Sequence, residues 1–182
     1  MSKNNITNYL FLDLELNQPS NTIIQIGYVI ANIYEDVILE RKCLDVNPNE
    51  TLNPYIIDLT GIKQEDVDKG MTLLEAFEIL KADHKKHNVF CNPVTWGGGD
   101  SVELMKQLAT AGYTGGGIFG RRWIDVKTIW HFKRINEQAP LQGGLARSMT
   151  KVGLKFEGRK HNAMDDAKNT FSLFQELRKH LK

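Results

Sequence analysis

Apolar and polar residues alternate, or form short apolar runs, at five places along the chain, and this pattern predicts β-strands there. The first strand is expected at residues 9–16, where leucines occupy every second position. Polar turns separate it from the next β-rich stretches. The other strands are predicted at 22–31, 37–44, 89–96 and 123–126.

Apolar residues at helical spacing predict helices between and after these strands. Thr72 is expected to cap the first helix, with Glu75 three residues later as its partner in a capping box. The stretch 47–68 carries loop signals, with Pro48 and Pro54 as breakers. The helices are expected at 72–87, from about 100, from 126 to about 134, at 141–152 and at 163–181.

Strands that come first and then alternate with helices are typical of an α/β fold, here a five-stranded mixed β-sheet flanked by α-helices. The chain has 182 residues, which predicts a single domain spanning residues 1–182. Hydrophobic residues make up 41% and charged residues 25%, so disordered, collagenous and disulfide-rich classes are excluded. A net charge of +1 excludes a strongly basic nucleic-acid coat, but it allows a nucleic-acid enzyme with a local basic rim.

Two cysteines, Cys43 and Cys91, lack C-x-x-C spacing, which favours a reducing environment with both as small apolar fillers. The first residues contain no apolar signal segment, and no run approaches 18 apolar residues. We therefore expect a cytoplasmic protein with no membrane partner. Both a monomer and a homodimer are compatible with the sequence.

The first predicted strand carries two carboxylates on one face. Side chains alternate along a strand, so Asp13 and Glu15 share the face opposite to the leucines. Residues two apart lie about 6.6 Å apart along a strand, which lets two carboxylates straddle a metal centre. A buried acid pair is costly unless it is paired or metal-bound, and its oxygens suit Mg²⁺ or Mn²⁺. The alternative is a solvated strand face, on which both acids contact water.

A second group of polar residues lies near the end of the sequence, where His161 precedes the adjacent acids Asp165 and Asp166. On the helical wheel of 163–181, Asp165 points about 170° away from the apolar stripe, toward water. Asp166 lies only about 90° from the stripe and can reach a site on the sheet. His161 falls in the preceding loop, from which it can approach a metal-bound water. The alternative is an exposed loop histidine that has no catalytic role.

Asp100 follows three glycines at the junction between a predicted strand and a helix. One interpretation makes Asp100 the N-cap of that helix. The other makes it a further acid of a metal site, with glycines that let a ligand approach the backbone. The spacing does not match the phosphate-binding pattern G-x-x-x-x-G-K, so a P-loop is rejected.

Together these residues resemble the DEDDh family of 3′–5′ exonucleases. The family pattern has D-x-E on the first strand, an Asp at a middle helix and H-x-x-x-x-D near the C-terminus. The stretches 59–62 (LTGI) and 156–161 (FEGRKH) are similar to the branch of histone-mRNA and small-RNA-trimming exoribonucleases. The residues that match the family pattern are Asp13, Glu15, Asp100, His161 and Asp166.

The resemblance implies a ribonuclease H-like fold and metal-dependent release of nucleoside monophosphates from the 3′ end of single-stranded nucleic acid, with RNA slightly preferred. It implies two Mg²⁺ or Mn²⁺ ions held by the four acids, and His161 as the general base. The backbones of Leu16 and Asn17 resemble positions that touch the terminal nucleotide. One position departs from the pattern, because Gly99 stands where the branch usually has a base-stacking aromatic residue.

Three alternatives stay open. In the first alternative the substrate is DNA, as for a proofreading or repair exonuclease. It stays open because nothing in the sequence reveals contacts to the 2′-hydroxyl, which would distinguish RNA from DNA. Otherwise the domain binds nucleic acid without cutting it, since fold does not determine function. The third alternative is a zinc site, which requires four residues to share one helix face: Asp83, His84, His87 and Cys91.

Basic residues offer contacts to backbone phosphates, although an exposed, solvated face explains them equally well. These basic residues are Arg121, Arg122, Arg147, Arg159 and Lys160.

Asp125 is expected to cap a helix rather than to join the acids of the metal site.

Overall fold

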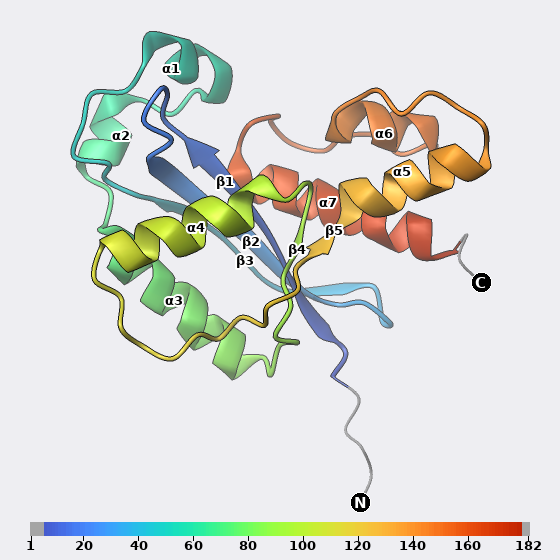
Figure 1. The fold of residues 1–182 in the computed structure, drawn as a ribbon, viewed down its shortest axis with the longest axis horizontal. Helices are drawn as coiled ribbons and strands as arrows, with labels where there is room; N and C mark the ends of the chain where they lie inside the picture. The colour runs from blue at the N-terminus through green and yellow to red at the C-terminus, as the bar shows by residue number, and fades with distance from the viewer. Residues whose placement is uncertain (1–5, 180–182) are drawn as a thin grey trace, which may run out of the picture.

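A five-stranded mixed β-sheet forms the centre of the protein (Figure 1). The structure is a computed structural model that describes residues 6–179. The strand order is β3-β2-β1-β4-β5, in which β1, β2 and β3 pair antiparallel and β4 and β5 continue parallel to β1. This confirms the predicted sheet. The strands are β1 (Asn8–Leu16), β2 (Ile23–Asn32), β3 (Val37–Asp45), β4 (Val94–Thr95) and β5 (Ile124–Asp125).

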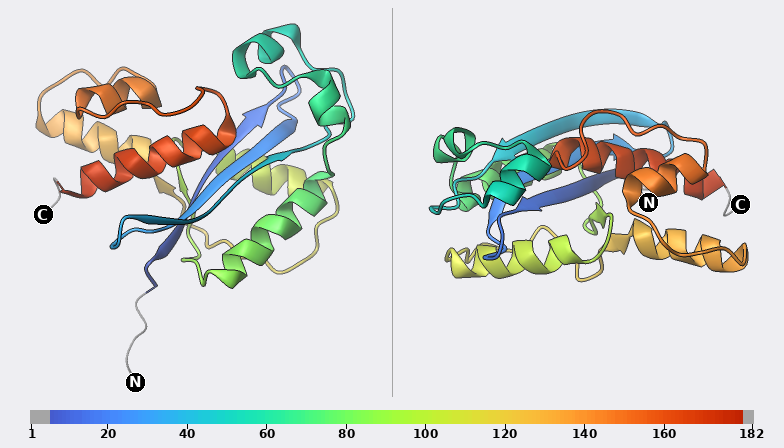
Figure 2. Two further views of the ribbon diagram at one scale, coloured as in Figure 1. Left: turned by 180° about the vertical axis from the view of Figure 1, so that it is seen from behind. Right: turned by 90° about the horizontal axis from the view of Figure 1, so that it is seen from above.

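Helices cover both faces of the sheet (Figure 2). On one face, Leu10, Leu12 and Leu14 of β1 join an apolar cluster with residues of α3 and α4. On the other face, Phe11 joins a cluster with residues of α5, α6 and α7. The two clusters alternate along β1 because successive side chains point to opposite faces. The helices are α3 (Leu73–Lys86), α4 (Gly99–Thr110), α5 (Val126–Asn136), α6 (Leu145–Lys151) and α7 (Ala163–Lys179).

Two short helices occupy the stretch 47–68, which was expected to be loop. These are α1 (Pro54–Thr60) and α2 (Gln64–Asp68). Pro54 starts a helix instead of breaking one, because a proline at the first position loses no intrahelical hydrogen bond. The side chain of Asn53 caps α1 by accepting a hydrogen bond from a backbone N–H in its first turn.

The fourth strand is much shorter than the predicted 89–96, since only Val94–Thr95 pairs with its neighbours. Pro93 has no N–H to contribute to a strand ladder, and the chain bends at residues 91–92. The helix predicted at 141–152 begins only at Leu145. Gly143 lies just before it with φ 131°, a conformation that no helix contains.

The predicted capping box of α3 is confirmed. Thr72 accepts a hydrogen bond from the backbone N–H of Glu75, and the Glu75 carboxylate accepts one from the N–H of Thr72. The predicted end of the last helix at Leu181 lies outside the described residues. Among the residues described, no helix is long and apolar enough to cross a membrane.

Candidate active site

The central strand delivers the predicted acid pair to the middle of the molecule. Asp13 and Glu15 lie on the same face of β1 as Phe11, near the C-terminal end of the strand. Glu15 is only 8% exposed, and Asp13 is partly buried. The alternative of two acids on a solvated strand face is therefore wrong, because helices cover this face as well.

The start of α7 rests directly on this part of the sheet. Gly27 of β2 pairs with Asp13 of β1. A side chain at Gly27 would collide with the backbone of Ala163, because a Cβ atom there would lie 2.0 Å from the Ala163 carbonyl carbon. The backbone N–H of Ala163 donates a hydrogen bond of 3.1 Å to Oε1 of Gln25. Sequence reasoning missed both contacts. A glycine inside an otherwise apolar strand was the available signal, because such a residue often marks a close backbone approach.

This docking brings His161 and Asp166 to the end of β1. His161 lies in the loop before α7, as predicted, with φ 60°. Its backbone N–H donates a hydrogen bond of 3.3 Å to Oδ2 of Asp166. Each of Glu15, His161 and Asp166 places one possible ligand atom within 4.8 Å of the other two. Three of the five predicted residues thus converge on one point.

Asp100 arrives from the other side, in the first turn of α4. It is not the N-cap, because α4 starts at Gly99 and Gly98 holds the capping position. Asp13 and Asp100 lie outside the set of mutual distances below 4.8 Å, but the charge of Asp100 acts on both Asp13 and Glu15. All four predicted acids therefore share one electrostatic environment.

The four carboxyl groups hold their protons unusually tightly. Burial and then the charges of Asp100, Asp166 and Glu15 raise the pKa of Asp13 well above its usual range. Burial and the neighbouring acids raise the pKa of Glu15 to about 8. Burial raises the pKa of Asp100 to about 7 and that of Asp166 to about 6, the latter partly offset by the N–H and the charge of His161.

Such a group of mutually repelling, oxygen-bearing ligands fits divalent cations. Every cause acting on the pKa values of Asp13 and Glu15 raises them, so no described cation compensates their charge. Hard cations prefer carboxylate oxygens and would allow all four groups to ionise at neutral pH. The residues present therefore suit Mg²⁺ or Mn²⁺.

Two further acids near the site have structural roles. Asp165 is half-buried, and its carboxylate accepts a hydrogen bond of 2.8 Å from the backbone N–H of Arg159, so this acid also fixes the loop that carries His161. Asp125 caps α5, as predicted, by accepting from the N–H of Lys127. It also accepts from the N–H of Gly97 at 2.9 Å and so ties down the chain before α4.

Leu16 and Asn17 follow directly after the acid pair. Asn17 is buried, and its side-chain amide donates to Glu50 and to the carbonyl of Thr51, while its side-chain carbonyl accepts from the N–H of Asn53. Its own N–H donates to the carbonyl of Thr22. The side chain of Asn17 thus joins two loops at the end of β1.

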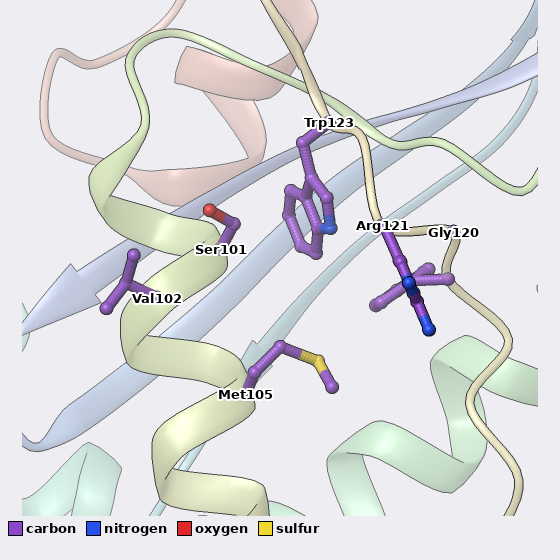
Figure 3. A pocket seen from close by; sticks show the side chains of 7 residues that line it. Ser101, Val102, Met105, Gly120, Arg121 and Trp123 are labelled. Atoms are coloured by element: carbon purple, nitrogen blue, oxygen red, sulfur yellow. The ribbon is translucent and has the colours of Figure 1, made fainter.

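A pocket of about 300 Å³ lies beside the N-terminal half of α4 (Figure 3). Met105 reaches from α4 toward Arg121 and Trp123, which come from the segment before β5. Ser101, one residue after Asp100, also lines the pocket. None of the five predicted site residues lines it, so this pocket adjoins the acid cluster without being part of it.

The residues of the alternative zinc site do not form one. Asp83 is bound by Nζ of Lys42 and by the hydroxyl of Tyr28, both at 2.6 Å. Cys91 is exposed, and His84 packs against an aromatic ring. Within the described part of the chain, the one group of three or more His, Cys, Asp or Glu ligands within mutual reach is Glu15, His161 and Asp166.

A family model described as Exonuclease (RNase_T) matches residues 10–174 of the chain. The chain is 32% identical over 174 residues to the 3′-5′ exonuclease Snipper of Drosophila melanogaster, and the match covers 85% of this chain and 60% of that protein. It is 27% identical over 172 residues to human ERI1 exoribonuclease 2, which covers 83% of this chain and 24% of that protein. The chain thus spans less than two thirds of the length of the first relative and about a quarter of the length of the second.

A solved structure shows the same fold. The nuclease domain of 3′hExo, a DEDDh family member bound to rAMP, superposes with a TM-score of 0.83 at 21% sequence identity. The superposition covers 97% of this chain and 94% of that domain. The mixed sheet with its flanking helices is therefore the ribonuclease H-like fold expected from the sequence.

Proposed function

This chain belongs to the exonuclease family RNase_T, and we propose that it releases nucleoside monophosphates from the 3′ end of single-stranded nucleic acid, with RNA slightly preferred over DNA. The observation that carries the proposal is the convergence of Glu15, His161 and Asp166, with Asp13 and Asp100 beside them. A non-catalytic relative would be expected to have lost at least one of these five groups.

The four acids are the proposed ligands of two divalent cations, Mg²⁺ or Mn²⁺. These are Asp13, Glu15, Asp100 and Asp166. Bound cations would stabilise negative charge on the scissile phosphate and lower the pKa of a water molecule. The chain itself contributes the rigid placement of its carboxylates, which come from β1, α4 and α7.

His161 is the proposed general base, which takes a proton from the attacking water at an imidazole nitrogen. An imidazole suits this task because it ordinarily titrates near neutral pH. The carboxylates are unsuited to it, because their role as cation ligands requires them to stay ionised. The hydrogen bond from the His161 N–H to Asp166 and the bond from Arg159 to Asp165 hold the loop in place.

The substrate assignment is supported by relatives and by the fold. The human relative is named an exoribonuclease, and the solved neighbour carries a ribonucleotide. The backbones of Leu16 and Asn17, at the end of β1, are the proposed contacts to the terminal nucleotide. The N–H of Asn17 is already bonded to Thr22, so its carbonyl is the group left for this contact. We also propose a reducing, cytoplasmic setting, which both free cysteines support.

The test uses single-stranded oligonucleotides of matched sequence, labelled at the 3′ or the 5′ end, incubated with Mn²⁺ with and without a chelator. We expect the 3′ label to be released at once as a mononucleotide and the 5′-labelled strand to shorten stepwise, in the absence of chelator only. A matched DNA strand measures the sugar preference. Release of the 5′ label first, or full activity in chelator, would contradict the proposal.

A further inference from the structure

The positive charges of this nearly neutral protein are unevenly distributed along the chain. Residues 139–161 contain five lysines and arginines and a single acid, Glu157, whose carboxylate is paired with Lys168. This stretch includes α6 and the loop that leads to His161. It therefore forms a basic segment that ends at the candidate active site.

Within this segment lies an open cleft of about 400 Å³, which we call the α6 cleft. Three of its lining residues are cations with exposed side chains, and none is aromatic. Among the residues described, the ion pairs involve other cations, so these three are free to bind an anion. The lining residues are Ala146, Arg147, Thr150, Lys151 and Lys160.

The cations of the α6 cleft are positioned by the fold. Arg147 and Lys151 are four residues apart on α6, so they share one face of that helix. The stem of Arg147 lies against Gly143, where an added Cβ would come within 3.1 Å of its Cδ. α6 itself packs against α7, the helix that carries Asp166. The cleft is thus joined by direct helix packing to the element that carries Asp166.

Lys160 connects the α6 cleft to the candidate active site. It directly precedes His161, and its positive charge is one of the influences that offset the effect of burial on the pKa of Asp166. An anion in the α6 cleft therefore lies next to the candidate site and outside it. Cations spread along an open cleft suit a chain of phosphates better than one small ion, and without aromatic side chains they contact the backbone independently of base sequence.

We propose that the α6 cleft binds the backbone phosphates of the substrate strand a few nucleotides upstream of its 3′ end, through Arg147, Lys151 and Lys160. This inference rests on the proposed function, because it places the rest of the strand whose 3′ terminus enters the active site. Its role is to hold a longer strand on the enzyme between cleavage events. A substrate too short to reach the cleft gains nothing from it.

The test compares the wild type with the double variant Arg147→Gln, Lys151→Gln. For an RNA of about twelve nucleotides we expect KM to rise roughly tenfold with kcat changed less than about twofold, so the preference in kcat/KM for this RNA over a dinucleotide falls roughly tenfold. The control is Lys69→Gln, Lys85→Gln, which removes the same charge from two other exposed lysines and should leave that preference unchanged.

Binding separates this inference from the proposed function. In chelator, fluorescence anisotropy with the same RNA should show weaker binding by the double variant and a salt dependence smaller by about 1.4 in log–log slope, about 0.7 per lost phosphate contact. A DNA strand of equal length should lose as much affinity as RNA. Unchanged affinity, or a loss limited to RNA, would overturn the proposal. A wild type that cuts nothing would refute the proposed function, while the binding comparison would still decide this one.

Discussion

Gly27 lies directly opposite Asp13 in the pairing of β2 with β1, at the point where the backbone of Ala163 meets the sheet. The absence of a side chain at Gly27 lets α7 begin on the sheet itself. Since α7 carries Asp166 and is preceded by His161, this one contact sets the distance between two halves of the candidate site.

The change Gly27→Ala should move the start of α7 away from the sheet, because the new Cβ would overlap backbone atoms that cannot rotate aside. We expect a strong loss of nuclease activity and a fall in Tm of roughly 3–10 °C, the range typical of overpacking by one methyl group. Gly116→Ala is the matched control, since a Cβ there would meet no atom within 4 Å. Wild-type activity and Tm in Gly27→Ala would show that the close approach does not set the site.

Asp165 and Asp166 are neighbours with opposite expected effects when each is changed to Asn. Asp166→Asn should reduce activity to that of the chelated protein. It should also raise the Tm of the metal-free protein at about pH 8, because burial raises the pKa of this carboxyl to about 6 and its charge is then unfavourable. Asp165→Asn should lower the Tm, since its carboxylate holds the N–H of Arg159. Thermal melts and cleavage assays distinguish the two, and identical effects would refute the division of roles.

The raised pKa values predict a link between pH, metal and stability. Glu15, Asp100 and Asp166, with pKa values of about 8, 7 and 6, bind protons more tightly in the folded state than ordinary carboxyls do. Their contribution to stability is therefore complete below pH of about 4 and is lost as the pH rises through about 8.

We accordingly expect the Tm of the metal-free protein to fall over this pH range. Excess Mn²⁺ should raise the Tm more at about pH 8 than at about pH 6, because cations bind the ionised carboxylates. Differential scanning calorimetry with and without Mn²⁺ measures both trends. A Tm gain independent of pH would argue against cation binding by these acids.

His161→Ala should lower the cleavage rate by about 10²- to 10⁴-fold, the usual contribution of a general base, while binding of Mn²⁺ measured by calorimetry is largely kept. Asp13→Ala should lose both cleavage and metal binding. Each variant thus serves as the control for the other. Cleavage at the wild-type rate by His161→Ala would rule out its role as the base.

Much of this arrangement was predictable from the sequence, because the relevant signals are local. The alternation of leucines with Asp13 and Glu15 predicted which face of the first strand carries the acids. The helical wheel selected Asp166 over Asp165 as the residue near the sheet, and the structure places Asp166 with Glu15 and His161.

What the sequence did not reveal depends on contacts between distant segments. The hydrogen bond of Asp165 to Arg159 arises from a loop that folds back on the helix, which a helical wheel does not describe. Gln25 lies within a predicted strand and carried no signal of its own, yet its side chain accepts the hydrogen bond that positions Ala163. The extent of β4 was overestimated, because the apolar residues around Pro93 satisfy the strand pattern but make only isolated backbone hydrogen bonds, such as that from the N–H of Phe90 to the carbonyl of Asn8, and no regular ladder.

The order of the site residues along the chain has a consequence for synthesis on the ribosome. Asp13 and Glu15 lie on the first strand, whereas Asp166 lies on the last helix described, which also completes the apolar cluster around Phe11. A nascent chain therefore has no assembled centre until α7 has left the exit tunnel and docked on Gly27. Under the proposed function, a chain that is still being synthesised therefore cannot cleave nucleic acid near the ribosome before its last described helix has docked.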